Sequence, residues 1–209
     1  MLKKRPILKM TTLALLAAVG VVLMSYIEIP YPPAPFLKIE VSDFVVIFTF
    51  LLFGFKEALL VAVVKTLGDL MFRGAVGPFA VGQITAFIAS LSYVFMLYIF
   101  NKLIKSDKIG FKVLKYFLVV TGVATIMVIA NYFFLTPIFL GKFSFLDMSN
   151  DSLASMTGIN SYLLSIIILY LPFNFLKGSL ISMIAVLFGD VLLNMYRRKL
   201  RIEDNYNAT

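Results

Sequence analysis

Apolar stretches long enough to cross a lipid bilayer recur along this chain and limit what it can fold into. Residues 7–29, 79–100 and 116–140 each supply a nearly unbroken run, and a helix needs about 20 such residues to cross the hydrocarbon core. Of the 209 residues, 61% are hydrophobic and 14% are charged, whereas soluble domains carry about 25% charged residues. The sequence therefore predicts an all-α integral membrane protein without a sizeable soluble domain.

The apolar runs divide into six predicted transmembrane helices that form a single membrane domain over residues 1–209. Their approximate bounds are residues 7–29, 43–54, 56–73, 79–101, 113–140 and 160–197. The first run has the position of a signal peptide, but its length and the missing cleavage site favour a retained helix. The last run is too long for one simple crossing, so we expect a break near Pro172.

Two of the predicted helices, 43–54 and 56–73, are short and are separated by Gly54 and the charged pair Lys56–Glu57. Short segments of this kind are typical of helices buried inside protein rather than surrounded by lipid. The Pro-rich segment 30–42 precedes them. It predicts an ordered external loop with an extended path, because proline restricts both its own backbone and that of the preceding residue.

Most of the 19 basic residues fall on one side of the predicted membrane domain. That side holds residues 3–9, Lys56, the lysine-rich loop 102–115 and residues 197–201. Cytoplasmic loops of membrane proteins carry an excess of Lys and Arg. Both termini are therefore predicted to be cytoplasmic.

Polar side chains inside the predicted helices gather in the outer half of the membrane, as judged from a helical rise of about 1.5 Å per residue. They are Asp69, Gln83, Asn131, Asn174 and Lys177. The external loop adds Lys38, Glu40 and Asp43 above them. Polar groups within membrane spans are costly and often functional. Together they predict a polar pocket that opens to the outside.

The same residues also have purely structural interpretations. Lys177 can extend its ammonium to the interface, Asn131 and Asn174 can hydrogen-bond between helices, and Glu40 can be a solvated loop charge. Their clustering favours the pocket, because a chance scatter would populate both leaflets.

The roles of three acidic or basic residues within the predicted helices stay open. Lys65 and Asp69 lie four residues apart on one helix and can pair with each other. Asp190 lies near the inner face and suits a structural role.

The sequence excludes several functional classes. It contains no Cys and no His, which removes thiol nucleophiles, the usual zinc ligands and the commonest general base. We therefore expect no catalytic residues, no metal site and no enzyme. No phosphate-binding loop of the G-x-x-x-x-G-K-[ST] type occurs, and no inverted repeat is evident. Transport by this chain would require energised partner subunits.

Three segments resemble one known family. Residues 36–44, Phe-Leu-Lys-Ile-Glu-Val-Ser-Asp-Phe, resemble the first external loop of riboflavin-specific S components of energy-coupling factor (ECF) transporters. Residues 171–178, Leu-Pro-Phe-Asn-Phe-Leu-Lys-Gly, resemble the last-helix motif of that family, and Ala14 with Ala18 resembles its small-residue docking motif. The resemblance covers nearly the whole chain.

The resemblance implies an S-component-like bundle that captures riboflavin outside a bacterial plasma membrane. It also implies a transmembrane coupling subunit and two ATPase subunits as partners, no nucleic acid, and toppling of the chain in the membrane to release the ligand inside. Riboflavin would be the transported ligand and not a cofactor. Ala14 and Ala18 would form the partner-docking face.

A flavin requires an apolar or aromatic slot and a few placed hydrogen-bonding groups. The candidate substrate-binding residues are Phe36, Leu37, Lys38, Glu40, Gln83, Asn131, Tyr132, Phe173, Asn174 and Lys177. Three alternatives stay open: an S component for a different vitamin, a membrane-embedded enzyme, and a scaffold protein without a ligand.

Overall fold

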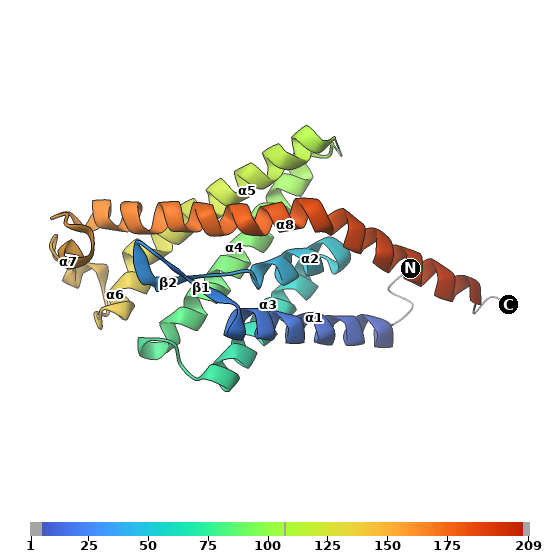
Figure 1. The fold of residues 1–209 in the computed structure, drawn as a ribbon, viewed down its shortest axis with the longest axis horizontal. Helices are drawn as coiled ribbons and strands as arrows, with labels where there is room; N and C mark the ends of the chain where they lie inside the picture. The colour runs from blue at the N-terminus through green and yellow to red at the C-terminus, as the bar shows by residue number, and fades with distance from the viewer. Residues whose placement is uncertain (1–5, 107, 207–209) are drawn as a thin grey trace.

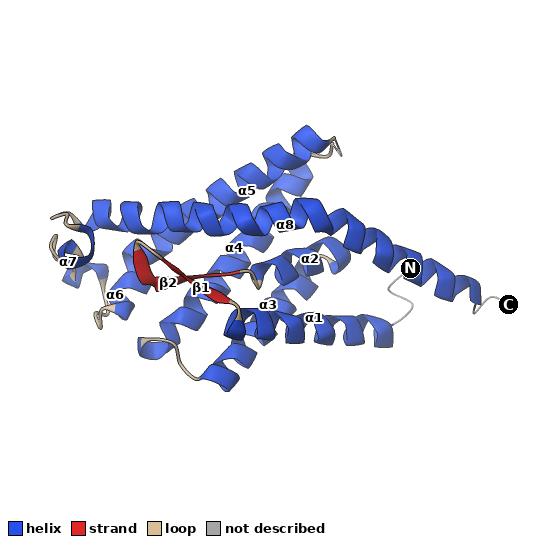
Figure 2. Cartoon of the chain, in the orientation of Figure 1, coloured by secondary structure: helices blue, strands red, loops and turns tan. Residues whose placement is uncertain are grey.

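The computed structural model describes residues 6–106 and 108–206 as a bundle of helices with a short β-hairpin laid across it (Figures 1 and 2). The first half contains α1 (Pro6–Tyr26), β1 (Glu28–Tyr31), β2 (Ala34–Glu40), α2 (Asp43–Phe53), α3 (Phe55–Arg73), the 3-10 turn η2 (Pro78–Ala80) and α4 (Val81–Leu103). The second half contains α5 (Ile109–Ala130), the π-helical turn η3 (Asn131–Leu135), α6 (Thr136–Phe139), the 3-10 turn η4 (Phe145–Asp147), α7 (Ala154–Thr157) and α8 (Tyr162–Tyr206).

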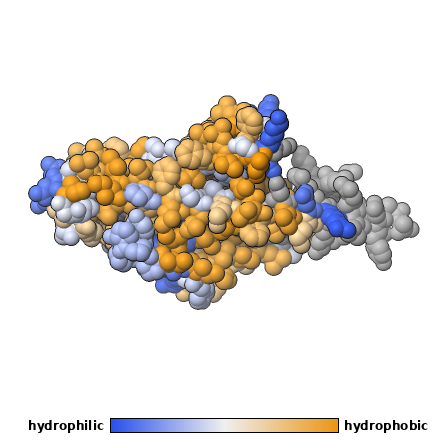
Figure 3. Space-filling view, turned by 45° about the horizontal axis from the view of Figure 1, so that its top comes forward, coloured by the Kyte–Doolittle hydropathy of each residue, from blue (hydrophilic) through white to orange (hydrophobic). Residues whose placement is uncertain are grey.

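Four of the described helical segments are long and apolar enough to cross a membrane. They are Pro6–Tyr26, Pro78–Leu103, Ile109–Phe139 and Tyr162–Met195. Large apolar side chains cover much of the surface between the ends of the molecule (Figure 3). This surface suits a lipid environment, in which apolar groups need no cover from water.

The short helix α2 lies at the centre of the bundle, as its length predicted. It packs against α1, α3, α4 and α8, and Val45, Val46 and Ile47 are fully buried. Its neighbour α3 differs from the prediction, because Leu60, Val64 and Leu67 are exposed along one face. Thus α2 is a buried core helix, while α3 is buried on one side only.

The predicted break near Pro172 is wrong. Helix α8 runs without interruption from Tyr162 to Tyr206 and contains Pro172, and Figure 1 shows it along most of the length of the molecule. A proline removes one backbone donor, and membrane helices tolerate this loss because neighbouring groups satisfy the freed carbonyl. The side chain of Asp190, for which a structural role was expected, lies outside the described residues.

The predicted external loop 30–42 forms most of a β-hairpin. Strands β1 and β2 pair antiparallel, with Glu28 opposite Glu40 and Pro30 opposite Lys38. The extended path expected from the prolines is therefore realised as strand. Tyr31 packs on Phe173 at 5.5 Å between ring centroids, and Phe36 stacks on Phe139 at 5.4 Å. The hairpin is thus attached to both α8 and α6.

Helices α1 and α3 approach closely because both carry glycine at the contact. A Cβ placed on Gly68 would lie 2.5 Å from Val21, and one placed on Gly20 would lie 3.2 Å from the Cβ of Lys65. Small residues allow membrane helices to pack at short range. This contact keeps α3 against α1 beneath the hairpin.

We expect Gly68→Ala to destabilise the protein by about 1–3 kcal/mol, because the added methyl overlaps Val21 and forces α1 away. Gly189→Ala is the matched control, since a Cβ there meets nothing within 4 Å and alanine favours a helix. Thermal unfolding in detergent micelles measures both. Equal unfolding midpoints for the two variants would contradict the close α1–α3 contact.

Candidate functional site

A cavity lies between the hairpin and the helices beneath it. Counted out to its open mouth, and so with some open solvent included, its space measures about 1010 Å³. Its walls come from α1, the hairpin, the loop between α3 and α4, helix α4, the junction of α5 with η3, and α8. Most of the lining is apolar, including Met24, Val81, Met127, Leu135 and Phe139.

Most of the predicted substrate-binding residues line this cavity. They are Phe36, Leu37, Lys38, Glu40, Asn131, Phe173, Asn174 and Lys177. They come from β2, from the start of η3 and from the middle of α8. The structure therefore brings together side chains that lie more than a hundred residues apart in the chain.

Gln83 and Tyr132 do not line the cavity, so their predicted direct role needs correction. Gln83 is buried behind the wall, where its amide donates to Asp69 Oδ2 at 2.9 Å and its oxygen accepts from Val76 N at 3.0 Å. Tyr132 packs on Phe145 and Tyr162. Gln83 thus supports the wall from behind, and Tyr132 belongs to an aromatic cluster beside it.

Two asparagines face the cavity with unused hydrogen-bonding capacity. Asn131 donates one N–H to the carbonyl of Met127 at 2.7 Å, and Asn174 does the same to Tyr170 at 2.7 Å. Each amide carries a second N–H and a carbonyl oxygen. The oxygen of Asn131 accepts from Thr136 Oγ1 at 3.4 Å, so the second N–H of both residues and the oxygen of Asn174 are available to a ligand. Asn131 begins the π-helical turn, and such turns occur frequently at functional sites.

Four charged residues form what we term the buried ion cluster: Glu40, Asp43, Lys65 and Lys177. Lys177 Nζ lies 2.6 Å from Glu40 Oε1 and 3.1 Å from Asp43 Oδ2. Lys65 lies 2.7 Å from Asp43 Oδ1. All four are buried, and charges inside a membrane protein persist only when paired. The expected pairing of Lys65 with Asp69 is wrong, because Lys65 binds Asp43 on α2 instead.

The buried ion cluster is completed by neutral donors and acceptors. Ser42 N donates to Glu40 Oε2 at 2.8 Å, and Ser90 Oγ donates to Asp43 Oδ1 at 2.5 Å. Burial raises the pKa of the Glu40 carboxyl on the hairpin, but the attraction of Lys177 and Lys65 together with the hydrogen bond from Lys177 outweighs it and holds that pKa below its ordinary value. Glu40 is therefore an ionised acceptor at neutral pH.

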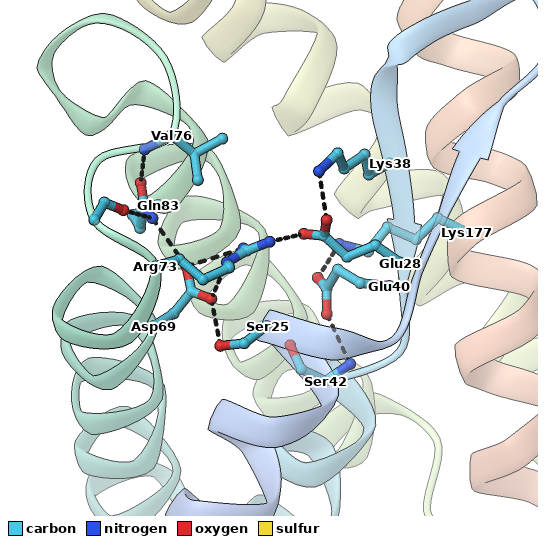
Figure 4. A network of polar contacts seen from close by, with 11 residues as sticks. Ser25, Glu28, Lys38, Glu40, Ser42, Asp69, Arg73, Val76, Gln83 and Lys177 are labelled. Carbon is cyan, nitrogen blue, oxygen red and sulfur yellow. Dashed lines mark hydrogen bonds and ion pairs between the residues drawn. The ribbon is translucent and has the colours of Figure 1, made fainter.

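A second group of charges, which we term the mouth ion cluster, consists of Glu28, Lys38, Asp69 and Arg73 (Figure 4). Glu28 accepts from Arg73 through Oε1 and from Lys38 at 2.5 Å through Oε2. Asp69 pairs with Arg73 Nε at 2.7 Å and accepts from Ser25 Oγ at 2.7 Å. The cluster ties the hairpin to the C-terminal end of α3.

The two clusters together contain four acidic and four basic groups, so their net charge is zero. The acids are Glu28, Glu40, Asp43 and Asp69, and the bases are Lys38, Lys65, Arg73 and Lys177. A charged ligand could pair with a residue of these clusters only by displacing the residue's present ion-pair partner. The arrangement suits an uncharged ligand that forms hydrogen bonds.

Sequence reasoning missed Glu28 and Arg73, which both line the mouth. The spacing of Asp69 and Arg73, four residues apart on α3, is the signal that could have found the second of them. Glu28 carries no comparable local signal, because its partners lie 10 and 45 residues away.

The predicted docking residues Ala14 and Ala18 are both exposed on α1. They lie among the exposed side chains of Leu15, Val19 and Val22. The opposite face of the helix, with Leu13, Ala17 and Val21, is buried in the bundle. The small-residue pair is therefore on the side of α1 that no described part of the chain covers.

These features define a class: a multi-pass helical membrane protein with a ligand-sized cavity that opens at one end. Comparison with known proteins assigns the family. The sequence profile of the ECF transporter substrate-specific component matches residues 8–188, so the chain belongs to that family. It is thus a transport protein of the plasma membrane and not an enzyme.

Curated relatives and a solved structure agree with this assignment. The chain is 30% identical to "Riboflavin transporter RibU" of Staphylococcus aureus over 201 residues, covering 91% of this chain and 93% of the relative. It is 29% identical to the protein of the same name from Streptococcus thermophilus, over 83% of this chain and 77% of the relative. A solved S component of a bacterial ECF transporter superposes with a TM-score of 0.66 at 25% identity, covering 90% of this chain and 96% of that chain.

We expect Lys177→Met to destabilise the ligand-free protein by about 3–5 kcal/mol, because it leaves buried carboxylates without their shared cation. Adding Glu40→Gln to this variant should restore part of the loss, since Asp43 keeps Lys65 as its partner. The exposed Lys142→Met serves as the control, with a change below about 1 kcal/mol. Unfolding midpoints in detergent test the set, and a double variant no more stable than Lys177→Met would contradict the buried ion cluster.

Proposed function

We propose that this chain binds riboflavin on the outer side of the membrane and delivers it to an ECF transporter for ATP-driven uptake. The observation that carries the proposal is the neutral, largely apolar cavity with Asn131, Asn174 and Lys177 on one side. Two curated relatives that share most of the chain's length carry the name riboflavin transporter. Riboflavin is uncharged, and the charges around the cavity sum to zero.

The cavity offers complementary groups to each part of a flavin. The flat ring needs apolar walls, which Leu37, Phe36 and Phe173 supply. The imide edge both donates and accepts hydrogen bonds, and the amides of Asn131 and Asn174 can do the same. Lys177 can donate to a ring carbonyl or a hydroxyl oxygen, while Glu40 can accept from a hydroxyl. Lys38 lies at the mouth of the cavity.

We further propose that the chain forms one membrane domain with six crossings and cytoplasmic termini. Helices α2 and α3 would supply the two crossings beyond the four long apolar segments. The exposed Ala14 and Ala18 would receive the transmembrane coupling subunit, because small residues let another helix approach closely. Two ATPase subunits would supply the energy, and toppling of the chain would release riboflavin inside.

Titration of the purified protein with riboflavin tests the proposal. Flavin fluorescence should be quenched as the ring enters the cavity, with saturation at one ligand per chain. An S component for another vitamin would leave riboflavin fluorescence unchanged and bind that vitamin instead. A scaffold protein would bind neither.

We expect Asn131→Ala and Asn174→Ala each to weaken riboflavin binding by about 1–3 kcal/mol, because each removes hydrogen bonds in a buried site. Asn160→Ala, at an exposed position in the outer loop, is the matched control. Dissociation constants from fluorescence quenching measure the effect. Wild-type affinity in both cavity variants would overturn this placement of the ligand.

We expect the double substitution Ala14→Leu/Ala18→Leu to abolish riboflavin uptake by cells while leaving binding to the purified protein intact. The larger side chains would prevent close contact with the coupling subunit. Thr125→Leu, at an exposed position on α5, should leave both uptake and binding unchanged. Normal uptake by the double variant would show that this face of α1 is not the docking surface.

A further inference from the structure

The mouth ion cluster contains one carboxylate that neutralises two cations of the cavity wall. Glu28 accepts from Arg73 through one oxygen and from Lys38 through the other, and all three residues line the cavity. Figure 4 shows the Glu28 carboxylate between the two cations, next to the Glu40–Lys177 pair. The hydrogen bonds proposed for the flavin make no use of Glu28.

We infer that Glu28 is a specificity-determining residue: by occupying Lys38 and Arg73, it selects uncharged flavins over flavins that carry a phosphate. The inference rests on the proposed function and goes beyond it. Glu28, at the mouth, would discriminate between riboflavin and its phosphate, whereas the residues that would hold the flavin ring would bind both.

The charges of the cluster explain the selection. With Glu28, the mouth ion cluster has two acids and two bases, and a phosphate would find no free cation and would face a carboxylate. Without the charge of Glu28, Arg73 keeps Asp69 as a partner, whereas Lys38 has lost its partner. Phosphate esters carry about −1.5 to −2 charges at neutral pH, and Arg and Lys are their usual protein ligands.

The geometry permits Lys38 to change partners. Its side chain is 44% exposed, whereas that of Glu28 is 16% exposed. An exposed ammonium on a long flexible stem can turn toward a ligand without disturbing the backbone. Glutamine at position 28 keeps the shape of glutamate and one oxygen acceptor, so Glu28→Gln removes the charge with little change in volume.

Two substitutions in the same ion pair should shift selectivity in opposite directions. Glu28→Gln leaves the mouth with one excess positive charge, while Lys38→Gln leaves it with one excess negative charge. Loss of an ion pair for purely structural reasons would affect both variants in the same way. The double variant Glu28→Gln/Lys38→Gln restores a net charge of zero.

The experiment measures dissociation constants for riboflavin and riboflavin 5′-phosphate by fluorescence quenching at pH 7.5 and low salt, using the whole purified chain. We expect Glu28→Gln to raise the affinity for the phosphate relative to riboflavin by about tenfold or more, and Lys38→Gln to lower it, as expected for charges within several ångströms of the ligand. The double variant should return near the wild-type ratio. High salt should reduce both shifts.

Glu57→Gln is the matched control, because Glu57 also pairs with a lysine, Lys9, but at the opposite end of α3. It should leave the ratio unchanged. An unchanged ratio in Glu28→Gln, or shifts of the same sign in Glu28→Gln and Lys38→Gln, would overturn the inference. If the wild-type chain bound neither flavin, the proposed function itself would fail.

Discussion

The pairing of Lys177 with Glu40 and Asp43 is the interaction on which the rest of the site depends. A charge inside a membrane bundle is tolerated only when its counter-charges come from the protein itself. Here those counter-charges come from β2 and α2, and Lys65 on α3 completes the cluster. The ion pairs of Lys177 on α8 therefore bring the hairpin and the central helix α2 together, and Lys65 adds α3 to the same cluster.

The same constraint shapes the cavity. The hairpin is fixed by ion pairs to Arg73 and Lys177 and by ring contacts with Phe139 and Phe173. The space beneath it stays open and mostly apolar, with amide groups at the junction of α5 with η3 and on α8. The ionised groups around the cavity neutralise one another. None of them therefore needs a charged ligand as its partner.

Much of this arrangement could be predicted from the chain alone. Helix length and the cost of burying polar groups predicted that Asn131, Asn174 and Lys177 lie at a similar depth, and the structure places all three on one cavity with Glu40 from the hairpin. The positions of two side chains depend on contacts between helices and could not be predicted from the local sequence pattern. Tyr132 packs on Phe145 and Tyr162 instead of lining the cavity, and Lys65 pairs with Asp43 on another helix and not with Asp69 on its own. Pro172 is accommodated within α8 because a membrane helix can lose one backbone donor without breaking.

The central claim is that the cavity holds riboflavin, and the ligand retained by the purified protein tests it most directly. Wild-type protein from cells grown in rich medium should carry a visible flavin absorption band, and denaturation should release riboflavin identifiable by mass spectrometry. Release of a different vitamin, or a colourless protein that stays colourless after incubation with riboflavin and removal of the excess, would contradict the account.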